Sequence, residues 1–257
     1  MPVATPTLAE LREVCQPQAK IESRNGEHWA GRLYMRRLSL RATRHLVRTS
    51  VSPNTLTWAM VVAGVGAGAA LLIPGVAGAL LAALLFQGFL FFDCVDGEVA
   101  RWKQQFSAVG VYVDRLGAYL ADAALLVGAG FRVAETASVA WVSVGMAAAL
   151  GIVLLKASTD LVDVARTRSG LGTAATEEST EIRSTRVNSV RRLAAAFKIH
   201  RIANGIEASL LFLVAALVEL GTGGHVPTQI AVAAVAVVAW LMVPAHLFSI
   251  LSSSRLR

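Results

Sequence analysis

Charged residues are scarce in this chain, and their scarcity argues against an ordinary water-soluble domain. Only 16% of the 257 residues are Asp, Glu, Lys or Arg, whereas 55% are hydrophobic; water-soluble domains carry about 25% charged residues. The two cysteines, Cys15 and Cys94, lie far apart and match no zinc-binding spacing. The first fifty residues are polar and basic and hold no long apolar run, so we expect no removable signal peptide.

Long apolar segments occupy much of the chain after its basic N-terminal part. A membrane-spanning helix needs about 20 mostly apolar residues, because backbone N–H and C=O groups find no water in hydrocarbon and must pair within the helix. We therefore predict an all-α integral membrane protein with six transmembrane helices. The expected spans are Leu56–Ile73, Val76–Phe92, Gly110–Phe131, Val139–Leu155, Ala203–Leu220 and Gln229–Leu251.

The net charge of +7 is compatible with nucleic-acid binding, but the placement of the basic residues indicates a membrane topology instead. Basic residues concentrate in four segments, Arg32–Arg48, Arg101–Lys103, Lys156–Arg201 and Arg255–Arg257. The intervening turns hold one Arg and no Lys between them: Pro74–Gly75, Arg132–Ser138 and Gly221–Thr228. Because cytoplasmic loops are enriched in Lys and Arg, we expect a multi-pass protein of the cell (cytoplasmic) membrane with both termini in the cytoplasm, and no nucleic-acid partner.

Residues 1–50 are predicted to form a cytoplasmic segment, and residues 51–257 the six-helix transmembrane domain. Within the first segment, Gly31–Ser50 alternates apolar residues with arginine at roughly helical spacing. It is either an amphipathic juxtamembrane helix, with its arginines toward anionic lipid phosphates, or a basic flank that fixes topology. Pro53 fits a helix start, and we expect Asn54 or Thr55 to cap the first span.

Acidic residues at the end of the second span form the strongest candidate for a functional site. If the helix continues through Arg101, then Asp93 and Asp96 share one face with Gly97, Ala100 and Arg101. Two carboxylates one turn apart offer the oxygen ligands that Mg²⁺ or Mn²⁺ prefers. The two small residues leave room for a nucleotide near the backbone, and the arginine is able to neutralise a phosphate.

The third span extends this polar site with Asp114 and, two turns further, Asp122. The short connection 102–109 makes the two spans antiparallel neighbours, so we expect Asp114 to face the two aspartates of the second span. Three carboxylates repel one another in a low dielectric, and divalent cations would relieve that repulsion. The competing interpretation is a buried ion-pair network in which Arg101 and Arg115 neutralise the acids.

This pattern resembles the signature of the CDP-alcohol phosphotransferase family, D-x-x-D-G-x-x-A-R-x8-G-x-x-x-D-x-x-x-D. Seven of the eight fixed positions match: Asp93, Asp96, Gly97, Ala100, Arg101, Gly110 and Asp114. The resemblance implies a homodimer of six-span subunits with an amphipathic N-terminal helix and a catalytic transmembrane domain. It also implies transfer of a substituted phosphate from a CDP-linked donor to a hydroxyl acceptor with release of CMP, in phospholipid or phosphodiester biosynthesis.

The resemblance further assigns roles to single residues. The metal, Mg²⁺ or Mn²⁺, would be held by Asp93, Asp96 and Asp114. The nucleotide would be contacted by Gly97, Ala100, Arg101 and Gly110, with Asn54 and Thr57 as weaker neighbours. After the fourth span, candidate contacts for the acceptor, a lipid or a sugar or polyol phosphate, are Lys156, Arg166 and Arg168; as plain sequence these three are equally basic anchors of the topology.

Ala118 departs from the signature, because it stands where the family has its fourth aspartate, the proposed general base. A methyl group cannot accept a proton. The substitution is engineered to trap a complex, natural with another base, or natural and inactivating. Asp122, one turn further, is a candidate substitute or a helix-packing residue, and Asp114 serves only if the metal leaves one oxygen free.

Two functions therefore stay open, an enzyme and a catalytically silent CDP-binding membrane protein. A transporter is disfavoured, since the sequence has no internal repeat and no helix-breaking Gly/Pro pairs at mid-membrane.

Overall fold

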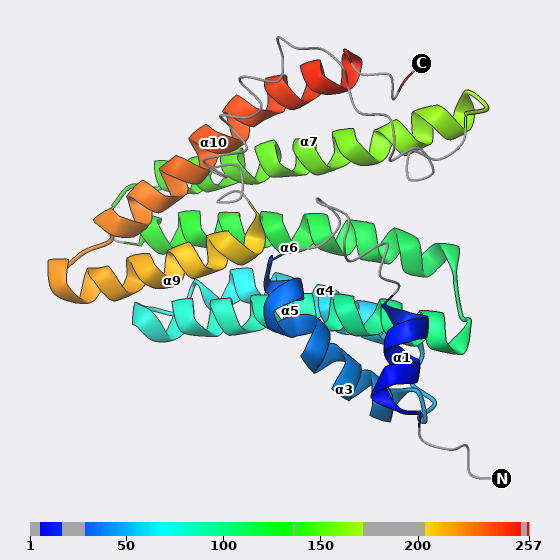
Figure 1. The fold of residues 1–257 in the computed structure, drawn as a ribbon. Helices are drawn as coiled ribbons and strands as arrows, with labels where there is room; N and C mark the ends of the chain where they lie inside the picture. Colours follow the sequence, from blue (N-terminus) through cyan, green and yellow to red (C-terminus); the bar gives the residue numbers. More distant parts are fainter. Residues whose placement is uncertain (1–5, 17–28, 136, 172–203, 253–255, 257) are drawn as a thin grey trace. The chain divides into compact units, whose positions relative to one another are not determined.

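The computed structural model describes residues 6–16, 29–135, 137–171, 204–252 and 256, and in these ranges the fold is helical throughout (Figure 1). The elements are α1 (Leu8–Cys15), the π-helical turn η1 (Gly31–Met35), α3 (Arg36–Leu46), α4 (Pro53–Ala70), α5 (Gly75–Lys103), α6 (Ala108–Ala134), α7 (Ala140–Arg168), α9 (Gly205–Thr222) and α10 (Val226–Leu251). The chain divides into two compact units. Unit 1 is Met1–Ala67 with Ala83–Ala121, and unit 2 is Gly68–Ala82 with Asp122–Arg257.

Five helices of the described chain are long and apolar enough to cross a membrane: α5, α6, α7, α9 and α10. They coincide with five of the six predicted spans and indicate a multi-pass membrane protein; the start expected for the fifth span, Ala203, lies outside the described residues. The first predicted span is also helical, as α4, but it is not among these five. Its first turn is polar, beginning Pro53-Asn54-Thr55, so its apolar stretch is shorter, and a sixth crossing stays a prediction.

The start of α4 at Pro53 agrees with the sequence prediction, but its capping residue differs. The helix begins at Pro53, and the backbone N–H of Thr55 donates to Ser52 Oγ at 3.2 Å. Ser52 is therefore the cap, and the prediction that Asn54 or Thr55 caps this helix is wrong. The physical reason is that Pro53 already occupies the first helical position, where its missing N–H is no loss.

The continuation of the second helix is confirmed, because α5 runs unbroken from Gly75 to Lys103. Gln104 follows with a φ of 55°, a left-handed conformation that ends the helix. α6 then starts at Ala108, and Ser107 caps it by accepting a hydrogen bond from Gly110 N at 2.9 Å. Only residues 104–107 separate the two helices.

The interior of unit 1 is built from α4, α5 and α6. Two buried clusters join these helices: Leu56 with Val95 and Val99, and Met60 with Val61 and Val113. Small residues allow the helices to approach closely, since a Cβ on Gly64 of α4 would lie 2.4 Å from the Cβ of Ala121 in α6. Close contact through glycine and alanine is how helices associate in lipid, where no hydrophobic effect drives them together.

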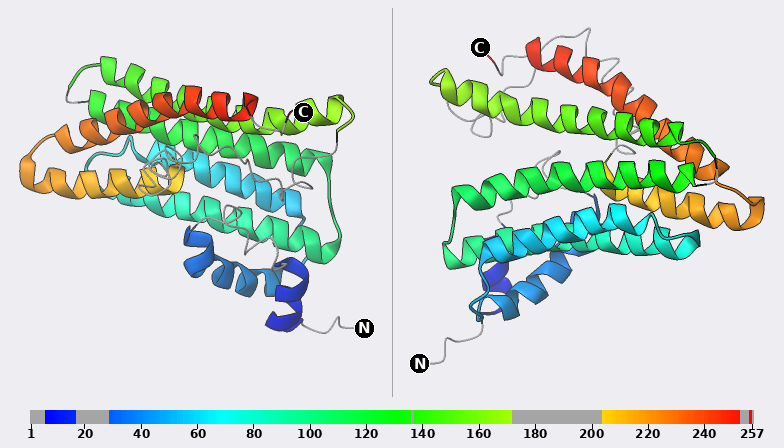
Figure 2. Two further views of the ribbon diagram at one scale, coloured as in Figure 1. Left: turned by 45° about the horizontal axis from the view of Figure 1, so that its top comes forward. Right: turned by 180° about the vertical axis from the view of Figure 1, so that it is seen from behind.

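In unit 2, α7 and α10 lie side by side in all three views (Figures 1 and 2). Trp240 Nε1 of α10 donates to the Ala147 carbonyl of α7 at 3.0 Å. A Cβ on Gly151 would lie 2.9 Å from the Cβ of Ala239. The pair is thus held by small-residue packing and by one hydrogen bond from an indole.

A buried ion pair ties together four helix ends of unit 2. Arg132 Nη2 near the end of α6 donates to Glu219 Oε2 near the end of α9 at 2.8 Å. Its Nη1 donates to the Gly75 carbonyl at the start of α5 at 2.9 Å. Thr228 in the first turn of α10 donates to the other carboxylate oxygen of Glu219. Arg132 is 3% exposed, so these partners offset the cost of burying its charge.

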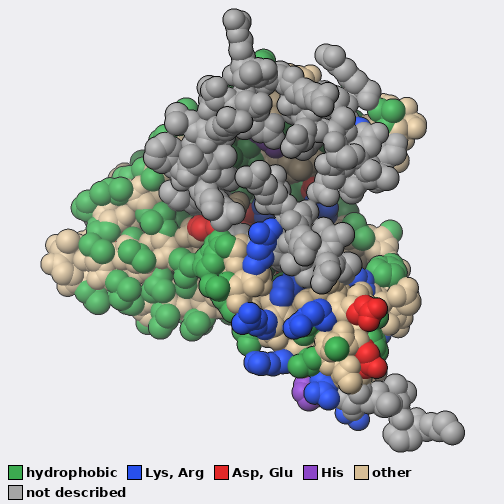
Figure 3. All heavy atoms as spheres, in the orientation of Figure 1, with side chains coloured by type: hydrophobic (Ala, Val, Ile, Leu, Met, Phe, Trp, Pro, Cys, Tyr) green, Lys and Arg blue, Asp and Glu red, His purple; other side chains and the backbone are tan. Residues whose placement is uncertain are grey.

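The amphipathic helix expected near the N-terminus is present as η1 followed directly by α3. Its buried face carries Ser39, Leu40 and Thr43, whereas Arg37 and Arg41 are exposed. Lys and Arg side chains gather on the surface over α3 (Figure 3). Whether this face meets lipid phosphates stays a prediction from the sequence.

Close packing at Gly68 leads to a first testable prediction. A Cβ on Gly68 would lie 2.3 Å from the Ala124 backbone oxygen, whereas a Cβ on Gly66, half a turn earlier in the same helix, would meet only Leu85 Cδ1 at an ordinary 3.6 Å. Both Gly→Ala changes gain about 1 kcal/mol of helix propensity, but overpacking at Gly68 costs roughly 1–3 kcal/mol. We expect Gly68→Ala to melt below Gly66→Ala in detergent, and equal melting temperatures would contradict the close approach.

Docking of α1 leads to a second prediction. Cys15 is fully buried, and its Sγ donates to the Glu98 carbonyl at 3.3 Å. Burial raises the pKa of the Cys15 thiol to about 11, with the charge of Glu98 adding to the rise and that of Arg101 opposing it. In a Cys94→Ala background we expect the folded protein to resist maleimide at pH 7.5 and to react rapidly in denaturant. Equal alkylation rates in the folded and denatured protein would show that α1 is not docked.

Candidate functional site

Three aspartates from α5 and α6 form the acidic centre of unit 1. Asp96 is buried, at 8% exposure, Asp114 is half-buried and Asp93 is exposed. Asp96 lies within electrostatic range of both others. The three carboxylates thus range from buried to exposed, and their like charges repel one another where water is partly excluded.

Thr57 of α4 supplies the hydrogen bond that holds the buried carboxylate. Its Oγ1 donates to Asp96 Oδ2 at 2.7 Å, and it lies 3.2 Å from the Pro53 carbonyl. A hydroxyl has one proton, and the shorter, charge-assisted bond to Asp96 is the stronger of the two. The structure shows that Thr57 orients Asp96, and the position near the nucleotide expected from the sequence stays a prediction.

Asn54 and Gly110 meet at the start of α6. Asn54 Oδ1 accepts a hydrogen bond from Ser107 Oγ at 3.1 Å, and Ser107 in turn caps α6. A Cβ on Gly110 would lie 2.7 Å from Asn54 Oδ1. The glycine therefore leaves room for Asn54 to reach Ser107, the cap of α6. Gly110 thus has a packing role in addition to the nucleotide contact expected from the sequence.

Arg101 lies over Gly97 in α5, within electrostatic range of Glu98 and Asp96. Its Nη1 and Nη2 are both 3.3 Å from the position that a Cβ on Gly97 would take. Its Nε donates to the carbonyl of Cys15, the last residue of α1, at 2.7 Å. Ala100 is half-buried beside it. Two small residues and an anchored guanidinium thus lie next to the acidic centre.

The remaining candidates belong to unit 2. Lys156 Nζ of α7 lies 2.7 Å from Asp122 Oδ2 of α6, and Asp122 is 3% exposed. This ion pair joins an expected acceptor contact to an expected substitute base, and it is also what a helix-packing role would require. Arg166 is buried and Arg168 is exposed, both near the end of α7.

The aspartates fit a divalent metal in ligand type but not in spacing. They supply only oxygen, which suits Mg²⁺ or Mn²⁺, and a cation would relieve the repulsion around Asp96. In the part of the chain that the structure describes, however, no three His, Cys, Asp or Glu side chains lie close enough together to hold an ion.

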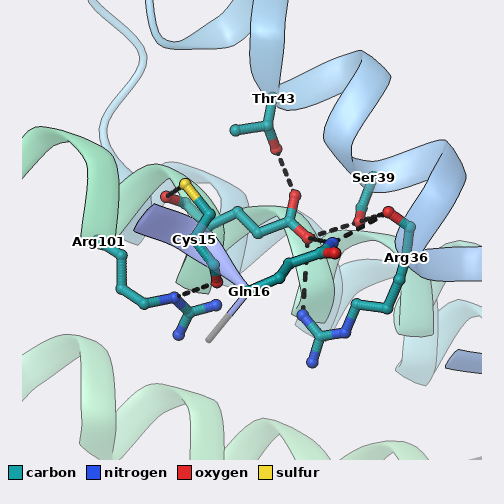
Figure 4. Close-up of polar contacts among 7 residues, drawn as sticks. Cys15, Gln16, Arg36, Ser39, Thr43 and Arg101 are labelled. Atoms are coloured by element: carbon teal, nitrogen blue, oxygen red, sulfur yellow. Dashed lines mark hydrogen bonds and ion pairs between the residues drawn. The ribbon is translucent and has the colours of Figure 1, made fainter. Parts of the chain in front are cut away.

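The sequence analysis missed Glu98, which is fully buried in α5. Its Oε1 accepts hydrogen bonds from Gln16 Nε2 at 2.7 Å and Ser39 Oγ at 2.7 Å, and its Oε2 accepts one from Thr43 Oγ1 at 2.8 Å (Figure 4). Arg36 Nη1 lies 3.6 Å from Oε1. One carboxylate thus joins α1 and α3 to α5.

A signal for Glu98 was present in the sequence. It is an acid within an apolar helix, and such a charge requires partners. The family signature leaves its position free, however, and the partners are 55 or more residues away along the chain. Only the folded structure identifies them.

Comparison with known proteins gives a family and no individual relative. A search of curated proteins finds no match to the chain. A family model described as CDP-alcohol phosphatidyltransferase matches residues 50–253. That range contains α4 to α10 and all three aspartates, and it leaves out α1, η1 and α3. Since it spans more than half of the sequence, the chain belongs to the CDP-alcohol phosphatidyltransferase family.

Proposed function

We propose that this protein is a metal-dependent CDP-alcohol phosphotransferase, which transfers a substituted phosphate from a CDP-linked donor to a hydroxyl acceptor and releases CMP. Family membership implies a CDP-alcohol donor. The observation that carries the proposal is the acidic centre, where buried Asp96 lies within range of Asp93 and Asp114 on the motif of that family. Five candidate spans support the membrane as its location.

Asp93, Asp96 and Asp114 would hold Mg²⁺ or Mn²⁺ once their carboxylates approach one another more closely than they do in this structure, and the ion would supply charge neutralisation for a diphosphate. Thr57 keeps Asp96 oriented through the 2.7 Å hydrogen bond. Arg101, fixed at Nε by the Cys15 carbonyl, presents its two terminal nitrogens beside Gly97, where a donor phosphate would accept from them.

The acceptor hydroxyl would attack the β-phosphorus in line with the departing CMP oxygen, so that one P–O bond forms as another breaks. Its proton must pass to a base, and Ala118 supplies none. Asp122 and Asp114 are the candidates. Asp122 forms an ion pair with Lys156, so it would accept a proton only after that ion pair opens. Lys156, Arg166 and Arg168 are proposed for the acceptor. The proposal includes a homodimer with both termini in the cytoplasm.

A second candidate function is a catalytically silent protein that binds a CDP-linked ligand. Ala118 favours it, because the binding residues are kept while the position of the family's base carries a methyl group. The two candidates share the acidic centre and differ only in turnover.

Binding of CDP tests the site common to both. We expect CDP with Mg²⁺ to raise the melting temperature of the purified protein, because a ligand at 100 times its Kd adds about 2.7 kcal/mol of stability. Asp96→Asn should abolish the rise, since it removes a charge from the proposed metal site. Glu13→Gln, which changes an exposed carboxylate of α1, is the control and should keep it. No rise in the wild type would refute both candidates and favour a transporter.

Turnover separates the two candidates. We expect CMP release from CDP-linked donors in the presence of hydroxyl acceptors, at a low rate. Ala118→Asp should increase it by about 10²–10⁴-fold if the family's base is the missing component. Absence of CMP release from the wild type, with CDP binding intact, would support the silent binder. Appreciable activity with no gain in Ala118→Asp would mean that another residue is the base.

A further inference from the structure

The C-terminal end of α1 makes three hydrogen bonds to α5 through two adjacent residues (Figure 4). In one, Cys15 Sγ donates to the Glu98 carbonyl at 3.3 Å. In the other two, Gln16 Nε2 donates to Glu98 Oε1 at 2.7 Å, and the Cys15 carbonyl accepts from Arg101 Nε at 2.7 Å. Cys15 is fully buried and Gln16 is 6% exposed. Because one peptide unit connects the two contacts, α1 cannot shift at Gln16 without moving the carbonyl that holds Arg101.

Glu98 is fixed independently of α1. Ser39 and Thr43, one turn apart on α3, donate to its two carboxylate oxygens at 2.7 and 2.8 Å. A buried carboxylate needs such donors, and with them it becomes a stationary acceptor. Gln16 also donates to the Arg36 carbonyl at 3.0 Å, so its amide is held from two helices at once. The end of α1 is therefore located by α3 and α5 together.

Arg101 needs this support because an arginine side chain is long and has many rotamers, whose entropy is lost when the guanidinium is held in one place. The bond from Nε to Cys15 selects the rotamer that lays the guanidinium over Gly97, with Nη1 and Nη2 both 3.3 Å from the position of a Cβ there. Asp96 is the neighbour of Gly97 in the sequence, and its charge lies within electrostatic range of Arg101. Because the bond to Cys15 uses Nε, Nη1 and Nη2 remain over Gly97 for a donor phosphate.

We infer that Gln16 and Glu98 are positioning residues of the donor site, which act by holding the end of α1 so that the Cys15 carbonyl fixes Arg101. Helices α1 and α3 lie outside the range matched by the family model, so this chain completes a family site with residues of its own N-terminal segment. The inference rests on the proposed function, since the donor diphosphate is taken as the ligand of Arg101.

Gln16 and Thr43 form a matched pair for the test. Each gives one hydrogen bond to the Glu98 carboxylate, but Gln16 belongs to the end of α1 and Thr43 to α3. A purely structural role for Glu98 makes the two bonds equivalent. A positioning role makes only the bond from Gln16 matter for the nucleotide.

The experiment measures the Kd of CDP with Mg²⁺ for the full-length protein in detergent, together with the melting temperature. We expect Gln16→Met, which keeps the shape and removes the donor of both hydrogen bonds, to Glu98 and to the Arg36 carbonyl, to raise Kd about five- to tenfold. Thr43→Val should lower the melting temperature and leave Kd within twofold. Arg101→Ala should raise Kd further, and adding Gln16→Met to it should change nothing more, because the two residues act in series.

Several results would overturn the inference while leaving the proposed function intact. They are an unchanged Kd in Gln16→Met, an equal rise in Thr43→Val, and additive effects of Gln16→Met and Arg101→Ala. If Gln16→Met does not fold, Gln16→Asn, which stays polar and is one methylene shorter, decides in its place by the same criterion. Failure of the wild type to bind CDP would overturn the proposed function as well.

Discussion

Two buried carboxylates on one helix determine how the rest of unit 1 is arranged. Asp96 and Glu98 are two residues apart in α5, so they point to nearly opposite sides of the helix. Neither charge is tolerated in an apolar interior without donors. α4 provides one for Asp96 through Thr57, whereas α1 and α3 provide several for Glu98. The need for hydrogen-bond donors to both carboxylates thus accounts for the helices that pack on the two sides of α5.

The close packing of α4 and α6 serves the same centre. Gly64 and Gly117 remove side chains where the helices approach, since a Cβ on Gly117 would lie 2.5 Å from Val61. Asn54 at the start of α4 then reaches the cap of α6. Small residues deeper in the bundle and polar contacts at its end therefore fix the same pair of helices, and with them the separation between Thr57 and Asp114.

Much of this arrangement was predictable from the sequence, because it depends on local patterns. Apolar length located five of the six predicted spans, and helical spacing predicts that Asp93 and Asp96, one turn apart, share a face of α5. The start of α4 at Pro53 was predicted correctly, but its cap was assigned to Asn54 or Thr55 and not to Ser52, because Asn, Thr and Ser are all good capping residues.

Contacts between distant segments were beyond sequence reasoning. Gln16 lies in an N-terminal segment that carries no motif, and nothing in its neighbourhood indicates that its amide meets a carboxylate 82 residues later. Thr57 was identified through the family resemblance, but its partner was not. The role of such a polar residue depends on its hydrogen-bond partner. Periodicity predicts which residues share a helix face, but not which other helix packs against that face.

The ion pair between Arg132 and Glu219 has a consequence for biosynthesis. The two residues are 87 positions apart, and α7 lies between them in the chain. During synthesis the arginine leaves the ribosome long before its carboxylate exists. Until α9 arrives, the carbonyls of Ile73 and Gly75 are the partners already made for it. The charge of Arg132 therefore stays without its carboxylate partner from the synthesis of α6 until α9 is made.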